Sequence, residues 1–156
     1  MARLVRKQFK LVSVLVLSGL VLAVWVTALL ADEPPEGLWL TEDGQATIAT
    51  GPCDKNSPTL CGVIVGLPGA RKNPALARYR KELCGLPVIW DLKWSEQKKR
   101  WQEGKILDPE TGKVHNLFLR AKTGKLLLRA YERVETLGAA LTWIRTDVVD
   151  GICSER

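Results

Sequence analysis

The sequence predicts an all-β fold, one antiparallel barrel of about eight strands with a single short helix. Strand-like runs alternate with turn signals at short intervals through the body of the chain. After Ala31, no stretch has the roughly ten periodic residues of a core helix. Antiparallel strands in one small domain remove their exposed edges by closing into a barrel. A two-sheet sandwich is the alternative arrangement.

The first half of the body contains three strand-like runs and the one helical stretch. Residues 37–41 and 46–50 flank the turn 42–44, whose Glu-Asp-Gly sequence is typical of a reversal. Residues 60–67 form an apolar run whose two glycines permit a bend or a bulge. Residues 73–81, NPALARYRK, have helical character over a turn or two at most.

The strand expected at residues 86–94 has the clearest alternation. Four apolar residues share one face of the period-two pattern: Val88, Trp90, Leu92 and Trp94. Asp91 and Lys93 lie on the other face, as in a strand buried on one side.

Four more strand-like runs complete the series, at residues 101–107, 114–120, 126–131 and 141–146. The turn 108–112 has proline at its second position and a later glycine, which suit a tight reversal. The turn 122–124, Lys-Thr-Gly, predicts a hairpin between the second and third of these strands.

Residues 1–31 are predicted to be a secretory signal peptide or a signal anchor. Four cations between residues 3 and 10 precede an uncharged, mostly apolar stretch from Leu11 to Ala31. This pattern is typical of a signal cleaved after Ala28 or Ala31, but about 20 apolar residues also span a bilayer. Either way, residues 32–156 form one exported domain with its core at 37–146. We expect a periplasmic protein that touches the membrane only through an uncleaved N-terminus.

The charge distribution argues against a nucleic-acid partner. The formal net charge is +6, but four of the 23 basic residues precede Leu11, and all 17 acidic residues follow Ala31. The body therefore carries 19 basic and 17 acidic residues and is nearly neutral, a poor basis for binding phosphates. Its 46% hydrophobic and 26% charged residues are typical of a globular domain.

The four cysteines favour disulfides, because an even number in a small exported domain is the usual disulfide context. They are Cys53, Cys61, Cys84 and Cys153. Three pairings are possible, and the sequence alone does not decide among them. We favour Cys53–Cys61, which closes a short loop between strands, and hence Cys84–Cys153. The sequence has no close CxxC pair and a single histidine, which argues against a zinc site. We therefore expect no metal.

No motif indicates an enzyme or a cofactor. The only histidine, His115, lies mid-strand with no nucleophile placed near it. Glu103 and Asp108 resemble a paired carboxylate site, but a solvated strand face and a turn account for them better. Neither a Walker pattern nor G-x-G-x-x-G occurs. We therefore expect no catalytic residue and no cofactor.

Two widely separated motifs look paired. Gly37 and Trp39 open the first strand, and Trp143 and Arg145 lie in the last. This arrangement resembles lipocalin-like barrels, in which a G-x-W motif packs beside an arginine of the last strand. An arginine over an indole face forms a cation–π contact and shields the ring.

The longer pattern resembles the family called domain of unknown function 2147, small exported bacterial proteins with a lipocalin-like barrel. The resemblance covers nearly all of residues 37–146 and rests on these motifs: Cys53…Leu60-Cys61-Gly62, Asn73-Pro74…Arg78…Arg80…Gly85, Asp108-Pro109…Gly112-Lys113 and Trp143…Arg145. Relatives usually carry acidic residues around the Asn-Pro motif, where this chain has Ala70 and Ala75. A ligand or ion contact made by those acids is therefore predicted to be lost. The family has no established activity, so the resemblance implies a fold and a compartment.

The function we expect is non-enzymatic binding of a small hydrophobic or amphipathic molecule. The candidate contacts are three tryptophans and three polar residues near the Asn-Pro motif: Trp90, Trp94, Trp101, Asn73, Arg78 and Arg80. The alternative use of the tryptophans is to fill the barrel completely. The alternative function is a cell-envelope interaction or structural module, anchored to the inner membrane by the N-terminal segment.

Overall fold

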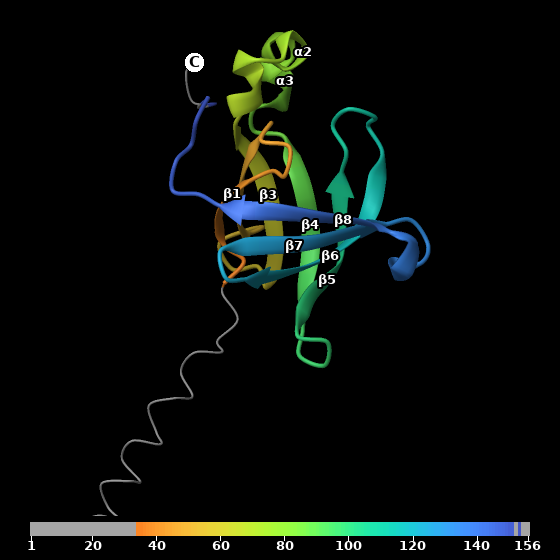
Figure 1. The fold of residues 1–156 in the computed structure, drawn as a ribbon. Helices are drawn as coiled ribbons and strands as arrows, with labels where there is room; N and C mark the ends of the chain where they lie inside the picture. The colour runs from red at the N-terminus through yellow and green to blue at the C-terminus, as the bar shows by residue number, and fades with distance from the viewer. Residues whose placement is uncertain (1–33, 152, 154–156) are drawn as a thin grey trace, which may run out of the picture. The chain divides into compact units, whose positions relative to one another are not determined.

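A computed structural model of the chain describes residues 34–151 and residue 153. The predicted signal or anchor lies outside the described residues. Eight antiparallel strands form a closed barrel in sequence order, so that β8 pairs with β1 (Figure 1). The strands are β1 (Gly37–Leu40), β2 (Thr47–Pro52), β3 (Thr59–Gly66), β4 (Pro87–Ser95), β5 (Arg100–Leu107), β6 (Val114–Lys122), β7 (Lys125–Tyr131) and β8 (Ala139–Arg145). The predicted fold class is confirmed, and the sandwich alternative is wrong.

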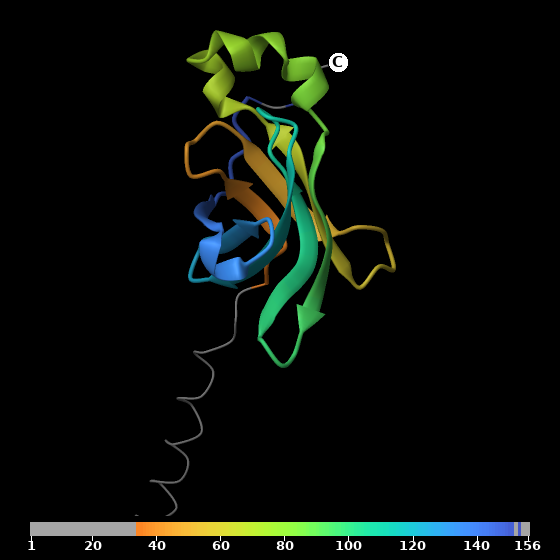
Figure 2. The same ribbon diagram turned by 90° about the vertical axis from the view of Figure 1, so that its right-hand side faces the viewer.

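Alternate connections of such a barrel lie at the same end. We call the end with the β1–β2, β3–β4, β5–β6 and β7–β8 connections the mouth, and the opposite end the base. Figure 2 shows the helical β3–β4 connection at the mouth and the β4–β5 turn pointing the other way.

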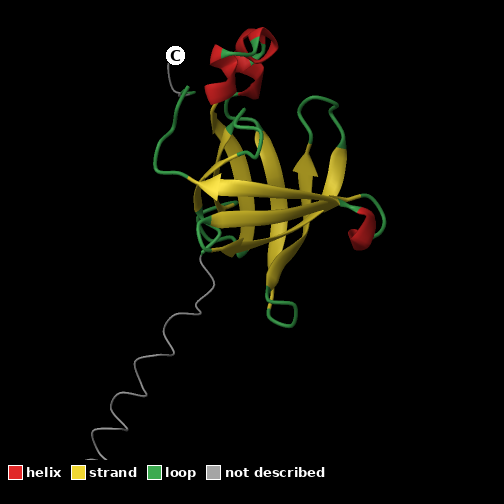
Figure 3. Cartoon of the chain, viewed as in Figure 1, coloured by secondary structure: helices red, strands yellow, loops and turns green. Residues whose placement is uncertain are grey.

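Helices are few and short (Figure 3). The β3–β4 connection contains η3 (Pro68–Arg71), α2 (Pro74–Arg78) and α3 (Arg80–Leu83), and the β7–β8 connection contains η4 (Glu135–Leu137). The helix expected at 73–81 is therefore broken at Tyr79 into two pieces. Asn73 caps α2 by accepting a hydrogen bond from the Ala75 amide.

Strand β4 departs from the alternation expected at residues 86–94. Its register against β3 shifts twice, and Asp91 has a φ of 62°, both typical of β-bulges. As a result Ile89 is buried beside its neighbour Val88, Leu92 is also buried, and Trp94 is 39% exposed. The prediction that Val88, Trp90, Leu92 and Trp94 form one continuous buried face is therefore wrong, because each bulge changes which side chains point inward.

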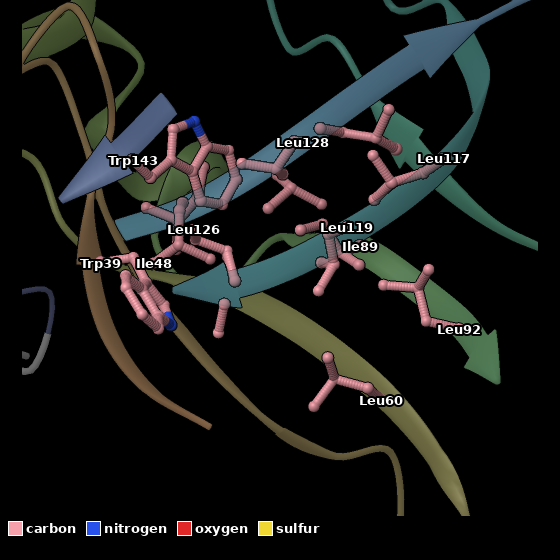
Figure 4. Close-up of a cluster of buried hydrophobic side chains, with 14 of the residues drawn as sticks. Trp39, Ile48, Leu60, Ile89, Leu92, Leu117, Leu119, Leu126, Leu128 and Trp143 are labelled. Carbon is pink, nitrogen blue, oxygen red and sulfur yellow. The ribbon is translucent and has the colours of Figure 1, made fainter. Parts of the chain in front are cut away.

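A cluster of buried hydrophobic side chains forms the core of the barrel (Figure 4). All eight strands contribute to it: Trp39, Ile48, Leu60, Ile89, Leu92, Ile106, Leu117, Leu119, Leu126, Leu128 and Trp143 are among its buried residues.

The base is sealed where the first and last strands meet. The guanidinium carbon of Arg145 lies 4.3 Å from the Trp39 ring centroid, and Trp39 is fully buried. Arg145 also donates hydrogen bonds to the carbonyls of Pro34 and Glu36, at 2.8 and 3.1 Å. A Cβ at Gly37 would lie 2.5 Å from Arg145 Nη1, which explains the glycine of the G-x-W motif. The predicted Trp39–Arg145 contact is confirmed.

The two favoured disulfides are both present. Cys53 is bonded to Cys61 across the β2–β3 connection, and Cys84 is bonded to Cys153. The second bridge joins the end of α3 to the C-terminal tail. The Cys153 amide also donates to the Val65 carbonyl at 3.0 Å. The tail is thereby fixed to the mouth half of the barrel.

Candidate ligand-binding site

The mouth half of the barrel is hollow. A cavity of about 1020 Å³ lies there, the upper end of the size range of small-molecule sites. Its wall is mostly apolar and includes Ala46, Ile48, Ile64, Leu67, Leu76, Leu83, Val88, Ile106, Ala130, Leu141 and Trp143.

The floor of the cavity is the top of the core. Ile48 and Trp143 line the cavity and belong to the buried core, with exposures of 2% and 5%. The sequence left open whether the barrel is filled or hollow. The structure combines both, because a buried core fills part of the barrel and a cavity lined partly by core residues occupies the rest.

Local packing holds the cavity wall in place beside the helical segment. Leu76 of α2 and Leu83 of α3 both line the cavity, and Cys84 bridges the end of α3 to the tail. A Cβ at Gly66 would lie 2.6 Å from the Asp150 carbonyl oxygen, so the tail packs directly on the end of β3. The Leu67 amide donates to the Gly151 carbonyl at 3.1 Å.

The rim of the cavity is acidic. Five carboxylates come from three connections at the mouth: Glu42, Asp43, Asp108, Glu110 and Glu132. The basic and titratable partners among the lining residues are Arg133 and His115. The rim therefore carries an excess of negative charge over an apolar interior.

Two of these carboxylates also shape their turns. Asp43 Oδ1 accepts hydrogen bonds from the Thr41 hydroxyl at 2.6 Å and the Gln45 amide at 3.0 Å. Asp108 Oδ2 accepts one from the Thr111 hydroxyl at 2.6 Å, which lowers the pKa of the Asp108 carboxyl. Asp108 is therefore ionised at neutral pH.

The tryptophans selected from the sequence lie away from this cavity. Trp94 and Trp101 face each other across β4 and β5 near the base, with ring centroids 5.9 Å apart. Trp94 also donates to Glu96 Oε1 at 2.6 Å. Trp90 is partly buried and lies at the register shift between Ile89 and Leu92. None of the three lines the cavity.

The polar candidates also lie outside the cavity lining. Asn73 is used as a helix cap, Arg78 is exposed on α2, and Arg80 is partly buried at the start of α3. The structure places these three close together in the helical segment but does not bring them to the tryptophans at the base.

The sequence did not identify the cavity rim as a site, and of its five acids only Asp108 was considered, as a partner of Glu103 in a paired carboxylate site. Each is a turn residue, or adjoins one, and turn chemistry alone accounts for acidic side chains there. A usable signal was present, because the β1–β2, β5–β6 and β7–β8 connections of an up-and-down barrel share one end. Grouping the charges of these three connections would have gathered the five acids together with Lys113 and Arg133.

The described residues contain no cluster of side chains that could bind a metal ion. His115 lies at the cavity edge, while Glu103 forms an ion pair with Lys93 at 3.5 Å. Between residues 34 and 153, residue 152 apart, no cluster of three His, Cys, Asp or Glu side chains is placed to hold a metal ion. No helix in the same part of the chain is long and apolar enough to cross a membrane.

Comparison with known proteins identifies relatives by sequence and by fold. The family model described as "Uncharacterized protein conserved in bacteria (DUF2147)" matches residues 37–145. Among solved structures, one from Helicobacter pylori is similar, titled "Protein HP1028 from the human pathogen Helicobacter pylori belongs to the lipocalin family". It shares 15% sequence identity at a TM-score of 0.52, over 72% of this chain and 82% of that one. No curated protein matches the sequence.

Proposed function

This chain belongs to the DUF2147 family of bacterial proteins, and we propose that it is a non-enzymatic binding protein whose half-hollow barrel holds a small hydrophobic or amphipathic molecule. The observation that carries the proposal is the cavity of about 1020 Å³ above the core. Eight-stranded barrels of lipocalin type are wide enough to hold one small ligand. The fold similarity to the Helicobacter pylori protein agrees with this use of the barrel.

The physical driving force for binding is burial of the ligand's apolar surface. The floor and wall present aliphatic side chains and one indole, and each Å² of apolar ligand surface buried there contributes about 25 cal/mol. Entry of the ligand needs no opening of the barrel, because the cavity reaches the mouth. An apolar part of the ligand belongs against Ile48 and Trp143, and any polar part belongs at the rim.

The two disulfides support an exported location. Disulfides form and persist in oxidising compartments such as the bacterial periplasm, and Cys53–Cys61 and Cys84–Cys153 are both bonded. Together with the cationic and apolar pattern of residues 1–31, they favour a periplasmic protein. Sequencing the N-terminus of the protein recovered from cells tests this. A start after residue 28 or 31 indicates a free protein, and an intact leader indicates an anchored one.

A dye-binding experiment with two matched variants tests the proposed function. The dye is N-phenyl-1-naphthylamine, a neutral apolar compound whose fluorescence rises when it leaves water. Ala130 lines the cavity, whereas Ala140 is exposed and pairs with Arg129 on the outer face. Ala130→Trp places an indole inside the cavity, and Ala140→Trp adds the same group outside.

The expected result is that the full chain and Ala140→Trp bind the dye, and that Ala130→Trp binds it at least about tenfold more weakly. Residues 1–33 are identical in all three proteins, so the difference reports on the barrel. Equal dye binding by the two variants, with both folded by circular dichroism, would overturn the proposal.

One observation favours the second candidate, an envelope interaction module. Leu127 on β7 and Ile144 on β8 are 39% and 46% exposed on neighbouring strands of the outer face. Exposed apolar side chains that gather on a surface indicate contact with a partner. Loss of partner capture in a Leu127→Ser/Ile144→Ser variant that still binds the dye would favour this second function.

A further inference from the structure

We propose that the cavity selects cationic amphiphiles, molecules with an apolar body and an ammonium or similar positively charged group, over anionic ones. This inference rests on the proposed function, since it assumes that the cavity takes a ligand. It deepens that function by naming the ligand's charge. The cavity supplies the binding site, and the carboxylates at its rim supply the selectivity.

The first step is the position of the charges. The five rim carboxylates come from the β1–β2, β5–β6 and β7–β8 connections and line the cavity. The wall below them is apolar down to the Trp143 floor. A ligand that places its apolar end on the floor therefore leaves its head group among carboxylates.

The second step is that no ion pair in the described structure neutralises a rim carboxylate. In the described part of the chain, ion pairs join Arg71 to Asp150, Lys93 to Glu103, Lys99 to Glu96 and Arg100 to Glu135, and none includes a rim carboxylate. Glu42 and the two rim aspartates accept hydrogen bonds from uncharged donors. The lining residues include a single arginine, Arg133, against the five acids.

The third step is the location of the nearest basic residues. Lys105 and Lys113 lie beside Glu132 and His115 in a smaller neighbouring pocket, and the helical segment carries several more. None of Lys105, Lys113, Arg78 and Arg80 lines the cavity, and Arg71 is paired with Asp150. Charges in water are screened over about 8 to 10 Å at physiological ionic strength, so the residues that line the cavity dominate the potential at the head group. A carboxylate or phosphate head group would meet like charges there, whereas an ammonium group would meet opposite ones.

Competition among three amphiphiles of equal chain length tests the proposal. Dodecylammonium, dodecanol and dodecanoate are titrated, below the concentrations at which they form micelles, against the dye bound to the full chain. We expect dodecylammonium to displace the dye at a concentration at least about tenfold lower than dodecanoate does, with dodecanol between them. Raising the salt concentration should narrow this ratio.

A pair of charge-neutralising variants locates the effect. Glu110→Gln/Glu132→Gln removes two rim charges whose side chains form no ion pair in the described structure. Glu96→Gln/Glu103→Gln removes the same net charge from the β4–β5 hairpin near the base. The measured quantity is the dodecanoate concentration that displaces the dye, divided by the dodecylammonium concentration that does so. We expect the rim variant to reduce this ratio at least about threefold and the hairpin variant to leave it unchanged.

The outcomes separate the two proposals. Equal or stronger displacement by dodecanoate overturns the charge selectivity and leaves ligand binding intact. If the rim variant and the hairpin variant change the displacement ratio equally, the rim carboxylates are not the source of the charge selectivity. Failure of the dye to bind the full chain, or equal binding to Ala130→Trp and Ala140→Trp, overturns the proposed function and this inference with it.

Discussion

The two disulfides are predicted to differ in how much they stabilise the protein. A disulfide stabilises mainly by restricting the unfolded chain, and the effect grows with the length of the loop that it closes. The sequence separation is 69 for Cys84–Cys153 and 8 for Cys53–Cys61. The loop-entropy relation then gives about 4 kcal/mol for the first bridge and about 2.5 kcal/mol for the second.

Urea unfolding of two double variants measures these contributions. Cys84→Ala/Cys153→Ala and Cys53→Ala/Cys61→Ala are unfolded beside the oxidised protein, with tryptophan fluorescence as the signal. The free energy of unfolding comes from linear extrapolation to zero urea. We expect both variants to be less stable and the variant that lacks the long loop to lose more.

An equal loss in both variants, or a larger loss from the short loop, would refute the reasoning. Such a result would mean that local packing around the cysteines outweighs restriction of the unfolded chain. Comparing the slopes of the unfolding curves shows whether either variant changes the surface exposed on unfolding.

Three further predictions concern single residues. Arg145→Ala removes the cation–π contact and two hydrogen bonds at the base, and should cost about 1 to 3 kcal/mol in urea unfolding; an unchanged midpoint would contradict the role of this closure. Gly104→Ala places a Cβ 2.4 Å from a leucine Cγ and should cost about 1 to 3 kcal/mol, whereas Gly51→Ala meets no atom within 4 Å and should be nearly neutral. The hydrogen bond from Arg100 lowers the pKa of Glu135 below its usual 4.5. The unsubstituted protein should therefore be more stable than Glu135→Gln above pH 4.5, and this difference should disappear as the pH falls through the lowered pKa. A difference in stability that persists at lower pH would count against this ion pair.

The strand order and the closure followed from local signals in the sequence. Turn sequences such as 108–112 and 122–124 marked the hairpins, and antiparallel hairpins in series leave only the contact between first and last strands to be decided. The G-x-W motif and Arg145 supplied that contact. The even number of cysteines in a domain expected to be exported predicted disulfides. The short loop between Cys53 and Cys61 favoured the pairing that the structure has.

The candidate site was harder to predict, because bulges change which side chains face inward. A strict period of two through residues 86–94 gives Trp90 and Trp94 the same face as Leu92, but β4 has an extra residue at each of two register shifts. Nothing in the alternation of apolar and polar residues identifies such positions. The predicted ligand contacts are also large aromatic side chains, whereas the cavity wall is mostly aliphatic.

A structure with a heavy-atom ligand tests the central claim most directly. Crystals of the protein grown with 12-bromododecylammonium allow the bromine to be located by its anomalous scattering. We predict one bromine site inside the barrel, against Ile48 and Trp143, with the ammonium group at the rim beside Asp108. A bromine found only outside the barrel, or a mouth half filled by side chains, would contradict the account.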